Sequence, residues 1–171
     1  MAHREIHGKS MHAAADAAID VDGLDWAILR ELQGNGRIPL AELGRRVGLG
    51  ASSTGERVRR LEETGVIRGY RADLDLQRLG YPVLAFIRVR LTHAERGPFA
   101  RIVEEVPEVV GCHHVTGEDC YLVRVVARSI AHLEEVAHEL TSHGSTTTSL
   151  VFSTLVEGKP FVRPLQAELN S

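Results

Sequence analysis

Arginine is concentrated in one stretch of the chain, where it could contact an anionic partner. Between positions 37 and 71 there are eight arginines and four glutamates, with no lysine. The local formal charge is therefore +4, although the whole chain carries −3. A guanidinium group forms planar, bidentate hydrogen bonds with phosphate and with guanine. The stretch therefore predicts a nucleic-acid contact surface, and a solvated helical face is the alternative interpretation.

The best placed of these arginines lie on a helix predicted over residues 53–65. Ser53, Arg57 and Arg60 are spaced i, i+4, i+7, which predicts one shared face that points outward when the apolar stripe packs. Ser53 and Glu56 also fit the Ser-x-x-Glu capping box at a helix start. Hydroxyls near a helix N-terminus suit base edges and phosphates. The predicted DNA-binding residues are Ser52, Ser53, Thr54, Arg57, Arg59, Arg60 and Arg68.

A second group of chemically capable residues consists of Cys112, His113, His114 and Cys120. On a strand, Cys112 and His114 share one face, and Cys120 begins the next strand, so the three could bind a metal or sense oxidation. The group lacks the ligand spacing of structural zinc sites, and a buried cysteine is commonly only a small core residue. Metal or thiol sensing is therefore kept as the alternative function.

The chain does not have the features expected of an enzyme or of a membrane protein. No nucleophile with a paired base, phosphate loop or acid pair is recognisable in the sequence, which predicts a non-enzyme without cofactor. No apolar run reaches the roughly 18 residues of a membrane span, and the start does not resemble a secretory signal. The two cysteines imply no disulfide framework. These features predict a cytoplasmic protein.

The arginine-rich helix is the last of three that the apolar spacing predicts before residue 66. One begins at Asp22, the next begins at Pro39, and the glycine-containing turn 48–50 leads into the third. Residues 66–71 are rich in β formers, which predicts a short ribbon or wing. Helix, turn and arginine-rich helix are typical of a DNA reader, so residues 21–71 are predicted to form a (winged) helix-turn-helix domain. Residues 1–20 are predicted to be a mobile arm.

The period of the pattern changes after a predicted linker, residues 72–81. Two strand-helix-strand units follow over residues 82–157, which predicts a ferredoxin-like βαββαβ domain and a C-terminal tail, residues 158–171. The fold class is therefore α+β. Both helices must cover one face of the sheet, so the other face keeps apolar residues uncovered and predicts self-association into a homo-oligomer. A two-fold dimer would bind a pseudo-palindromic site on double-stranded DNA.

The spacing of these residues resembles one family over about residues 22–157. The matching motifs are Asp22-Gly-Leu-Asp-x-x-Ile-Leu, Gly36-Arg, Val47-Gly-Leu, Arg57-Val-Arg-Arg-Leu-Glu-x-x-Gly-Val-Ile-x-Gly-Tyr and Val115-Thr-Gly, and they are similar to those of the Lrp/AsnC (feast/famine) transcriptional regulators. The resemblance implies a DNA-reading module joined to an effector-binding domain. It also implies dimers that assemble into octamers or other multiples, with an amino acid as effector between subunits.

The resemblance further implies where the effector binds. The family's effector loop usually reads Gly-Asp-x-Asp, whereas this loop reads Gly117-Glu118-Asp119-Cys120, so a cysteine replaces the second acid. Backbone N–H groups at Gly117 would bind the carboxylate of an amino acid, and Glu118 or Asp119 its ammonium. A tight turn followed by an ordinary strand is the alternative. The predicted effector residues are Gly117, Glu118, Asp119, Cys120, Thr146 and Thr148, the last two matching the family's Thr-x-Thr.

Overall fold

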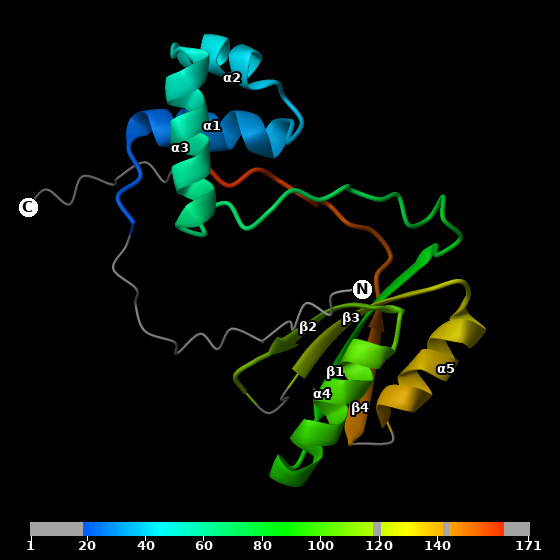
Figure 1. Cartoon of the computed structure of the whole chain (residues 1–171). Coiled ribbons are helices and arrows are strands. Elements are labelled where there is room, and N and C mark those ends of the chain that lie inside the picture. Colours follow the sequence, from blue (N-terminus) through cyan, green and yellow to red (C-terminus); the bar gives the residue numbers. More distant parts are fainter. Residues whose placement is uncertain (1–18, 118–120, 142–143, 163–171) are drawn as a thin grey trace, which may run out of the picture. The chain divides into compact units, whose positions relative to one another are not determined.

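The computed structural model describes residues 19–117, 121–141 and 144–162, and the chain forms two units (Figure 1). One unit comprises Met1–Arg71 together with Gly158–Ser171, and the other comprises Ala72–Glu157. The described part of the predicted tail therefore belongs with the N-terminal helices. Nearly all of the predicted arm lies outside the described residues, as do Glu118, Asp119 and Cys120.

Three helices build the first unit. The first begins after Asp22, whose side chain accepts a hydrogen bond of 2.8 Å from the Asp25 backbone N–H, while the Asp25 carboxylate accepts one of 3.1 Å from the Asp22 N–H. The second ends at Val47, and its C-cap Gly48 has the left-handed conformation with φ +75°. The helices are α1 (Gly23–Gly34), α2 (Leu40–Val47) and α3 (Ala51–Glu63), and the hydrophobic core of the unit consists of Ile28, Ile38, Leu43, Val58 and Leu61. This arrangement confirms the predicted helix-turn-helix.

Two local predictions for this unit are wrong. Helix α3 begins at Ala51 after the N-cap Gly50, so Ser53 lies within the first turn and forms no capping box. Residues 66–71 contain no strand, which corrects the predicted wing. Instead the Ile67 N–H donates to the Leu61 carbonyl at 2.9 Å, and Val66 and Ile67 pack against the helical core. The β formers there serve core packing after the helix end rather than strand pairing.

The contact between α2 and the following turn leaves no room for a side chain at Gly44. A Cβ there would lie 2.6 Å from the Leu49 carbonyl oxygen and 2.8 Å from the Thr54 hydroxyl. A Cβ at Gly55, inside α3, would meet only the Leu40 side chain at an ordinary 3.5 Å. An alanine side chain would therefore clash at position 44 and would fit at position 55.

Gly44→Ala is expected to lower the free energy of unfolding of the helical unit by about 1–3 kcal/mol, because the new methyl group forces backbone atoms apart. The matched change Gly55→Ala is expected to raise it by about 0.5–1 kcal/mol, since alanine favours a helix interior. Urea denaturation followed by far-ultraviolet circular dichroism measures both. Equal effects from the two substitutions would contradict the packing described.

The second unit is a four-stranded antiparallel sheet with two helices. The strand order is β2-β3-β1-β4, which is the order of a ferredoxin-like βαββαβ domain and confirms the predicted fold class. A short 3₁₀ turn precedes the first helix. The elements are β1 (Val83–Arg90), α4 (Arg96–Glu105), β2 (Val109–His114), β3 (Tyr121–Ala127), α5 (Ile130–Thr141) and β4 (Ser145–Leu150).

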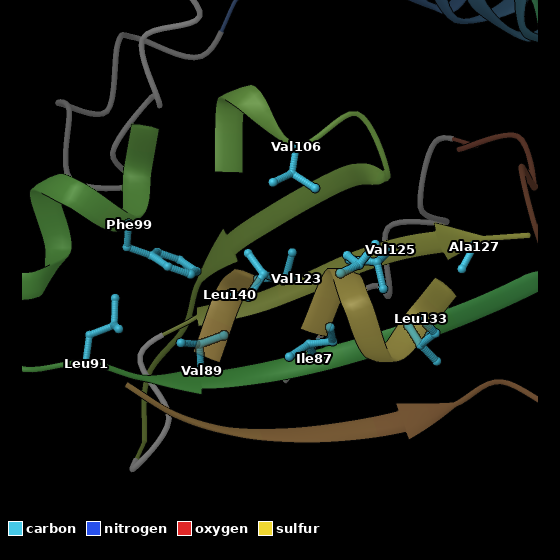
Figure 2. Close-up of a cluster of buried hydrophobic side chains, with 12 residues drawn as sticks. Ile87, Val89, Leu91, Phe99, Val106, Val123, Val125, Ala127, Leu133 and Leu140 are labelled. Atoms are coloured by element: carbon cyan, nitrogen blue, oxygen red, sulfur yellow. The ribbon is translucent and has the colours of Figure 1, made fainter. Parts of the chain in front are cut away.

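Both helices cover the same face of the sheet, as predicted. Alternate residues of the central strands, such as Ile87 opposite Val123, point into the core, and Phe99, Leu133 and Leu140 from the helices pack on them (Figure 2). The residues that alternate with these core residues along each strand point to the opposite face of the sheet. That face has no helix among the described residues, and its half-buried and buried residues include Leu84, Phe86, Leu122 and Val126.

Candidate nucleic-acid interface and effector loop

Helix α3 has one buried face and one outward face. Thr54, Val58 and Leu61 are buried, so the face opposite them carries Ser52, Glu56 and Arg59, and Ser53 is exposed beside them. The Arg59 side chain is 68% exposed, and its nearest carboxylate is Glu63 at 3.9 Å. The outward face of α3 therefore carries Ser52, Glu56 and Arg59, whereas the sequence predicted Ser53, Arg57 and Arg60.

Arg57 and Arg60 point instead to the start of α1. An Arg57 Nη1 atom lies 2.8 Å from one oxygen of Asp25 and 2.7 Å from Asp22, and Arg60 pairs with the other Asp25 oxygen. The Asp25 side chain is 0% exposed, whereas Arg57 is 28% and Arg60 45% exposed. A buried carboxylate needs charged partners, which explains why both arginines turn inward. The predicted outward orientation of Arg57 is thus wrong.

These four residues, called here the Asp25 cluster (Asp22, Asp25, Arg57 and Arg60), form ion pairs that shift the pKa values of Asp22 and Arg57. A hydrogen bond from the Asp25 backbone, and then Arg57, lower the pKa of the Asp22 carboxyl below its ordinary value. Hydrogen bonds to Asp22 and Asp25 raise the pKa of Arg57. Because the Asp22 pKa is lowered in the folded protein, its stabilisation is present above the unfolded value of 3.8 and is lost as the pH falls through the folded value.

The arginines of α2 are also paired. Arg46 lies 2.8 Å from Glu42 and 3.1 Å from Glu31, and Arg45 contacts Glu42 as well. Hydrogen bonds from Arg46, and then Arg45, lower the pKa of Glu42. The fold thus brings acids of α1 into the arginine-rich stretch, and the +4 counted along the sequence overstates the local positive charge. Arg59 and Arg68 are exposed arginines of the predicted set.

Thr54 serves the fold rather than a partner. Its side chain is buried, and its hydroxyl donates a 2.9 Å hydrogen bond to the Gly50 carbonyl, which holds the first turn of α3 to the preceding turn. A side chain without exposed surface cannot contact DNA, so this part of the predicted set is wrong. The role of Asp25 was missed by the sequence analysis, and its sequence signal was its position in the first turn of a helix.

The predicted effector residues approach one end of the sheet. Gly117 is exposed with φ +110°, a backbone conformation that favours glycine. Tyr121, which follows the loop, is opposite Val89, which is opposite Thr146, so these three residues align across three strands. With neighbouring strands about 4.8 Å apart, Thr146 lies roughly 10 Å across the sheet from Tyr121.

The two threonines lie on the helix-covered face of the edge strand β4. Thr148 is opposite Ile87 and is exposed, and the Thr146 hydroxyl lies 3.1 Å from that of Thr141 at the end of α5. Glu118, Asp119 and Cys120 fall outside the described residues, so the anionic part of the predicted site is not located. The described part supplies hydroxyls and a glycine turn at the same end of the sheet.

Of the residues of the metal-sensing alternative, Cys112 and His114 are described, whereas Cys120 lies outside the described residues. Within the described ranges, no group of three His, Cys, Asp or Glu residues could hold a metal ion. Cys112 is half-buried and packs against the sheet core, and burial raises the pKa of its thiol to about 11. The ring of His114 stacks on Tyr121 at 5.0 Å. Cys112 therefore has the environment of a core residue.

Cys112 is expected to react slowly with iodoacetamide at neutral pH, about 100-fold more slowly than in the urea-unfolded protein, because the raised pKa reduces the thiolate fraction. Mass spectrometry of the peptide containing Cys112 gives the rate, and the unfolded protein is the matched control. Equal rates in the two states would show that the thiol is accessible and ionised.

No helix among the described residues is long and apolar enough to cross a membrane.

In comparisons with known proteins, residues 21–62 match the AsnC-type helix-turn-helix domain and residues 84–161 match the Lrp/AsnC ligand binding domain. The leucine-responsive regulatory protein of Rhizobium meliloti (strain 1021) is 41% identical over 145 residues, covering 82% of this chain and 93% of that protein.

Two further relatives show the same range of similarity. The proline dehydrogenase transcriptional activator of Rhodobacter capsulatus is 38% identical over 137 residues, which cover 77% of this chain and 89% of that protein. The crystal structure of a Neisseria meningitidis transcriptional regulator in complex with L-Met superposes with a TM-score of 0.78 at 31% identity, covering 83% of this chain and 96% of that one.

Proposed function

The chain belongs to the Lrp/AsnC family of transcriptional regulators, and we propose that it binds operator DNA through α3 and changes that binding when an amino acid occupies its sheet domain. The observation that carries the proposal is the exposed polar face of α3, presented by a helix-turn-helix. A regulator of this kind performs no covalent chemistry on its ligand, which fits the non-enzymatic interpretation of the sequence.

The DNA contacts are assigned to the outward face of α3 and its flanks. Arg59 extends from the middle of that face, and Ser52 and Ser53 lie in the first turn, where the positive end of the helix dipole favours phosphate. Arg68 follows the helix and is exposed. Arg57 and Arg60 fix the helix through Asp25, although Arg60 keeps enough exposed surface for a phosphate contact.

The effector is proposed to be an amino acid, bound at the end of the sheet that carries Gly117 and Thr146. The relative from Neisseria meningitidis was solved with L-Met, and the Rhizobium meliloti relative is named for its response to leucine, which supports this ligand class without fixing its side chain. Glu118 or Asp119 would accept the ammonium group, Gly117 would donate backbone N–H groups to the carboxylate, and Thr146 and Thr148 would add hydroxyls. The relative that activates proline dehydrogenase supports target genes of amino-acid metabolism.

A homo-oligomer is proposed to form through the helix-free face of the sheet. Leu84, Phe86 and Leu122 on this face are half-buried apolar residues that a second copy could cover. A two-fold dimer presents two α3 helices to two half-sites, so the operator should be a pseudo-palindrome on double-stranded DNA. Further assembly to an octamer would need additional contacts.

Selection from a random DNA pool with the full-length protein tests the proposed function. The enriched duplex is expected to bind with a steep salt dependence, because phosphate neutralisation releases counterions. Its affinity is then measured with each of the twenty amino acids, beginning with L-methionine and L-leucine. No enriched sequence would contradict DNA reading, and an unchanged affinity with all twenty would contradict the amino-acid effector.

A further inference from the structure

The segment that follows the sheet returns to α1 and docks on it. The Gln33 side-chain amide donates to the Phe161 carbonyl at 2.8 Å and accepts from the Phe161 backbone N–H at 2.7 Å. The Phe161 ring lies 6.0 Å from the ring of Trp26. Phe161 and Val162 line a shallow groove with Trp26 and Ala27. One glutamine therefore satisfies both backbone groups of a residue 128 positions away, and an aromatic contact accompanies the pairing.

The same segment is anchored to the other unit just before it docks. Glu157, the last residue of the sheet unit, forms an ion pair with Arg124 of β3. Three residues, Gly158, Lys159 and Pro160, separate Glu157 from Phe161. Four residue steps of chain span at most about 14 Å when fully extended. The two anchors are thus joined by a very short piece of chain.

The chain passes between its two units twice. The first passage lies in residues 72–82, which follow the helical unit and contain no helix or strand. The second passage is the short connection from Glu157 to Phe161. A long linker alone leaves the DNA-binding unit free to sample many positions, whereas a second, short connection restricts that sampling.

We propose that residues 158–162 act as a second tether, which positions the DNA-binding unit by docking Phe161 on Gln33 and Trp26 of α1. The inference rests on the proposed DNA-binding function. In a dimer, each recognition helix must reach its own half-site, and the second binding event depends on how closely the linkage matches the span between sites. The docked tether pre-organises that span, so it raises the affinity for two half-sites without contacting DNA.

Trp26 supplies a direct probe of docking, because it is the only tryptophan of the chain. Phe161→Ala and Gln33→Ala are each expected to shift the emission of Trp26 to longer wavelength as the indole becomes more exposed to water. Phe152→Ala is the matched control, since Phe152 is 95% exposed, and it should leave the spectrum unchanged. This measurement needs neither DNA nor effector.

The functional arm uses the DNA duplex enriched by the wild-type protein and a shortened duplex with one half-site. Gln33→Ala is expected to lower the affinity for the two-half-site duplex about tenfold and to leave the half-site affinity unchanged. Gln77→Ala, at an exposed glutamine of the connecting stretch, is the matched control and should behave as wild type on both duplexes.

The outcomes separate the tether from the proposed function. An unchanged Trp26 spectrum in both Phe161→Ala and Gln33→Ala would overturn the docking, and an equal loss on both duplexes would make the segment an ordinary part of the DNA-binding fold. Two-half-site affinity within twofold of wild type would also overturn the tether. If the wild type enriches no DNA sequence, the proposed function fails, while the fluorescence still decides whether the segment docks.

Discussion

Asp25→Ala is expected to lower the free energy of unfolding of the helical unit by about 2–3 kcal/mol, the largest stability loss for any single residue of the Asp25 cluster. The Asp25 carboxylate is fully buried and binds Arg57 and Arg60 with its two oxygens. Removing it leaves two guanidinium groups beside an apolar core without their shared anion. Both arginines are partly exposed to solvent, so the expected loss in the free energy of unfolding is smaller than that for breaking a fully buried ion pair.

Asp22→Ala and Asp25→Asn are the controls for this substitution. Asp22→Ala removes a helix cap and one partly exposed ion pair, so its loss of stability should be smaller than that of Asp25→Ala. Asp25→Asn keeps the shape and loses the charge, so its effect should lie between those of the other two variants. Urea denaturation measures all three. A loss from Asp25→Ala no greater than that from Asp22→Ala would show that burial of Asp25 adds nothing to the cluster.

Arg59→Ala is expected to weaken binding of the selected operator by about 10- to 100-fold while leaving the free energy of unfolding unchanged. Arg59 is the most exposed arginine of α3 and has only a distant partner, so its removal takes nothing from the fold. Arg57→Ala is expected to lower the free energy of unfolding, because the Arg57 side chain forms ion pairs with Asp22 and Asp25.

Fluorescence anisotropy with labelled operator at fixed salt measures the affinity. Arg101→Ala is the matched control, since Arg101 is an exposed arginine on α4 of the other unit. It should bind the operator as wild type does. Wild-type affinity in Arg59→Ala would remove the outward face of α3 from the DNA interface and leave Arg68 and Arg60 as the next candidates.

The sheet domain was largely predictable because its signals are local. Strand β3, Tyr121–Ala127, lies within the predicted strand-helix-strand units of residues 82–157, since its apolar residues mark it directly. Pro82 and Pro107 likewise limit where neighbouring strands can begin. By contrast, the predicted domain extended to residue 157, whereas its last strand, β4, ends at Leu150. Val151 and Phe152 continue the apolar pattern, but the pairing with β1 ends with the hydrogen bond from the Val151 N–H to the Leu84 carbonyl.

The direction of the Arg57 and Arg60 side chains on α3 was not predictable in the same way. The spacing of Arg57 and Arg60 correctly places them on neighbouring positions of α3, but their direction depends on Asp25, which is 32 and 35 residues away. A charge count over one segment cannot include acids that only the fold brings near. The docking of Phe161 left no sequence signal either, because a single glutamine provides both of its backbone partners.

The discontinuity of the helical unit has a consequence for biosynthesis. Helices α1 to α3 are complete when the ribosome has passed residue 63, but the partner of Gln33 and Trp26 is Phe161, which is added 98 residues later. Domains generally begin to fold as their segments emerge during translation. The groove beside Trp26 therefore stays unfilled while the entire sheet domain is synthesised, and the helical unit gains its contact with Phe161 only after that domain has emerged.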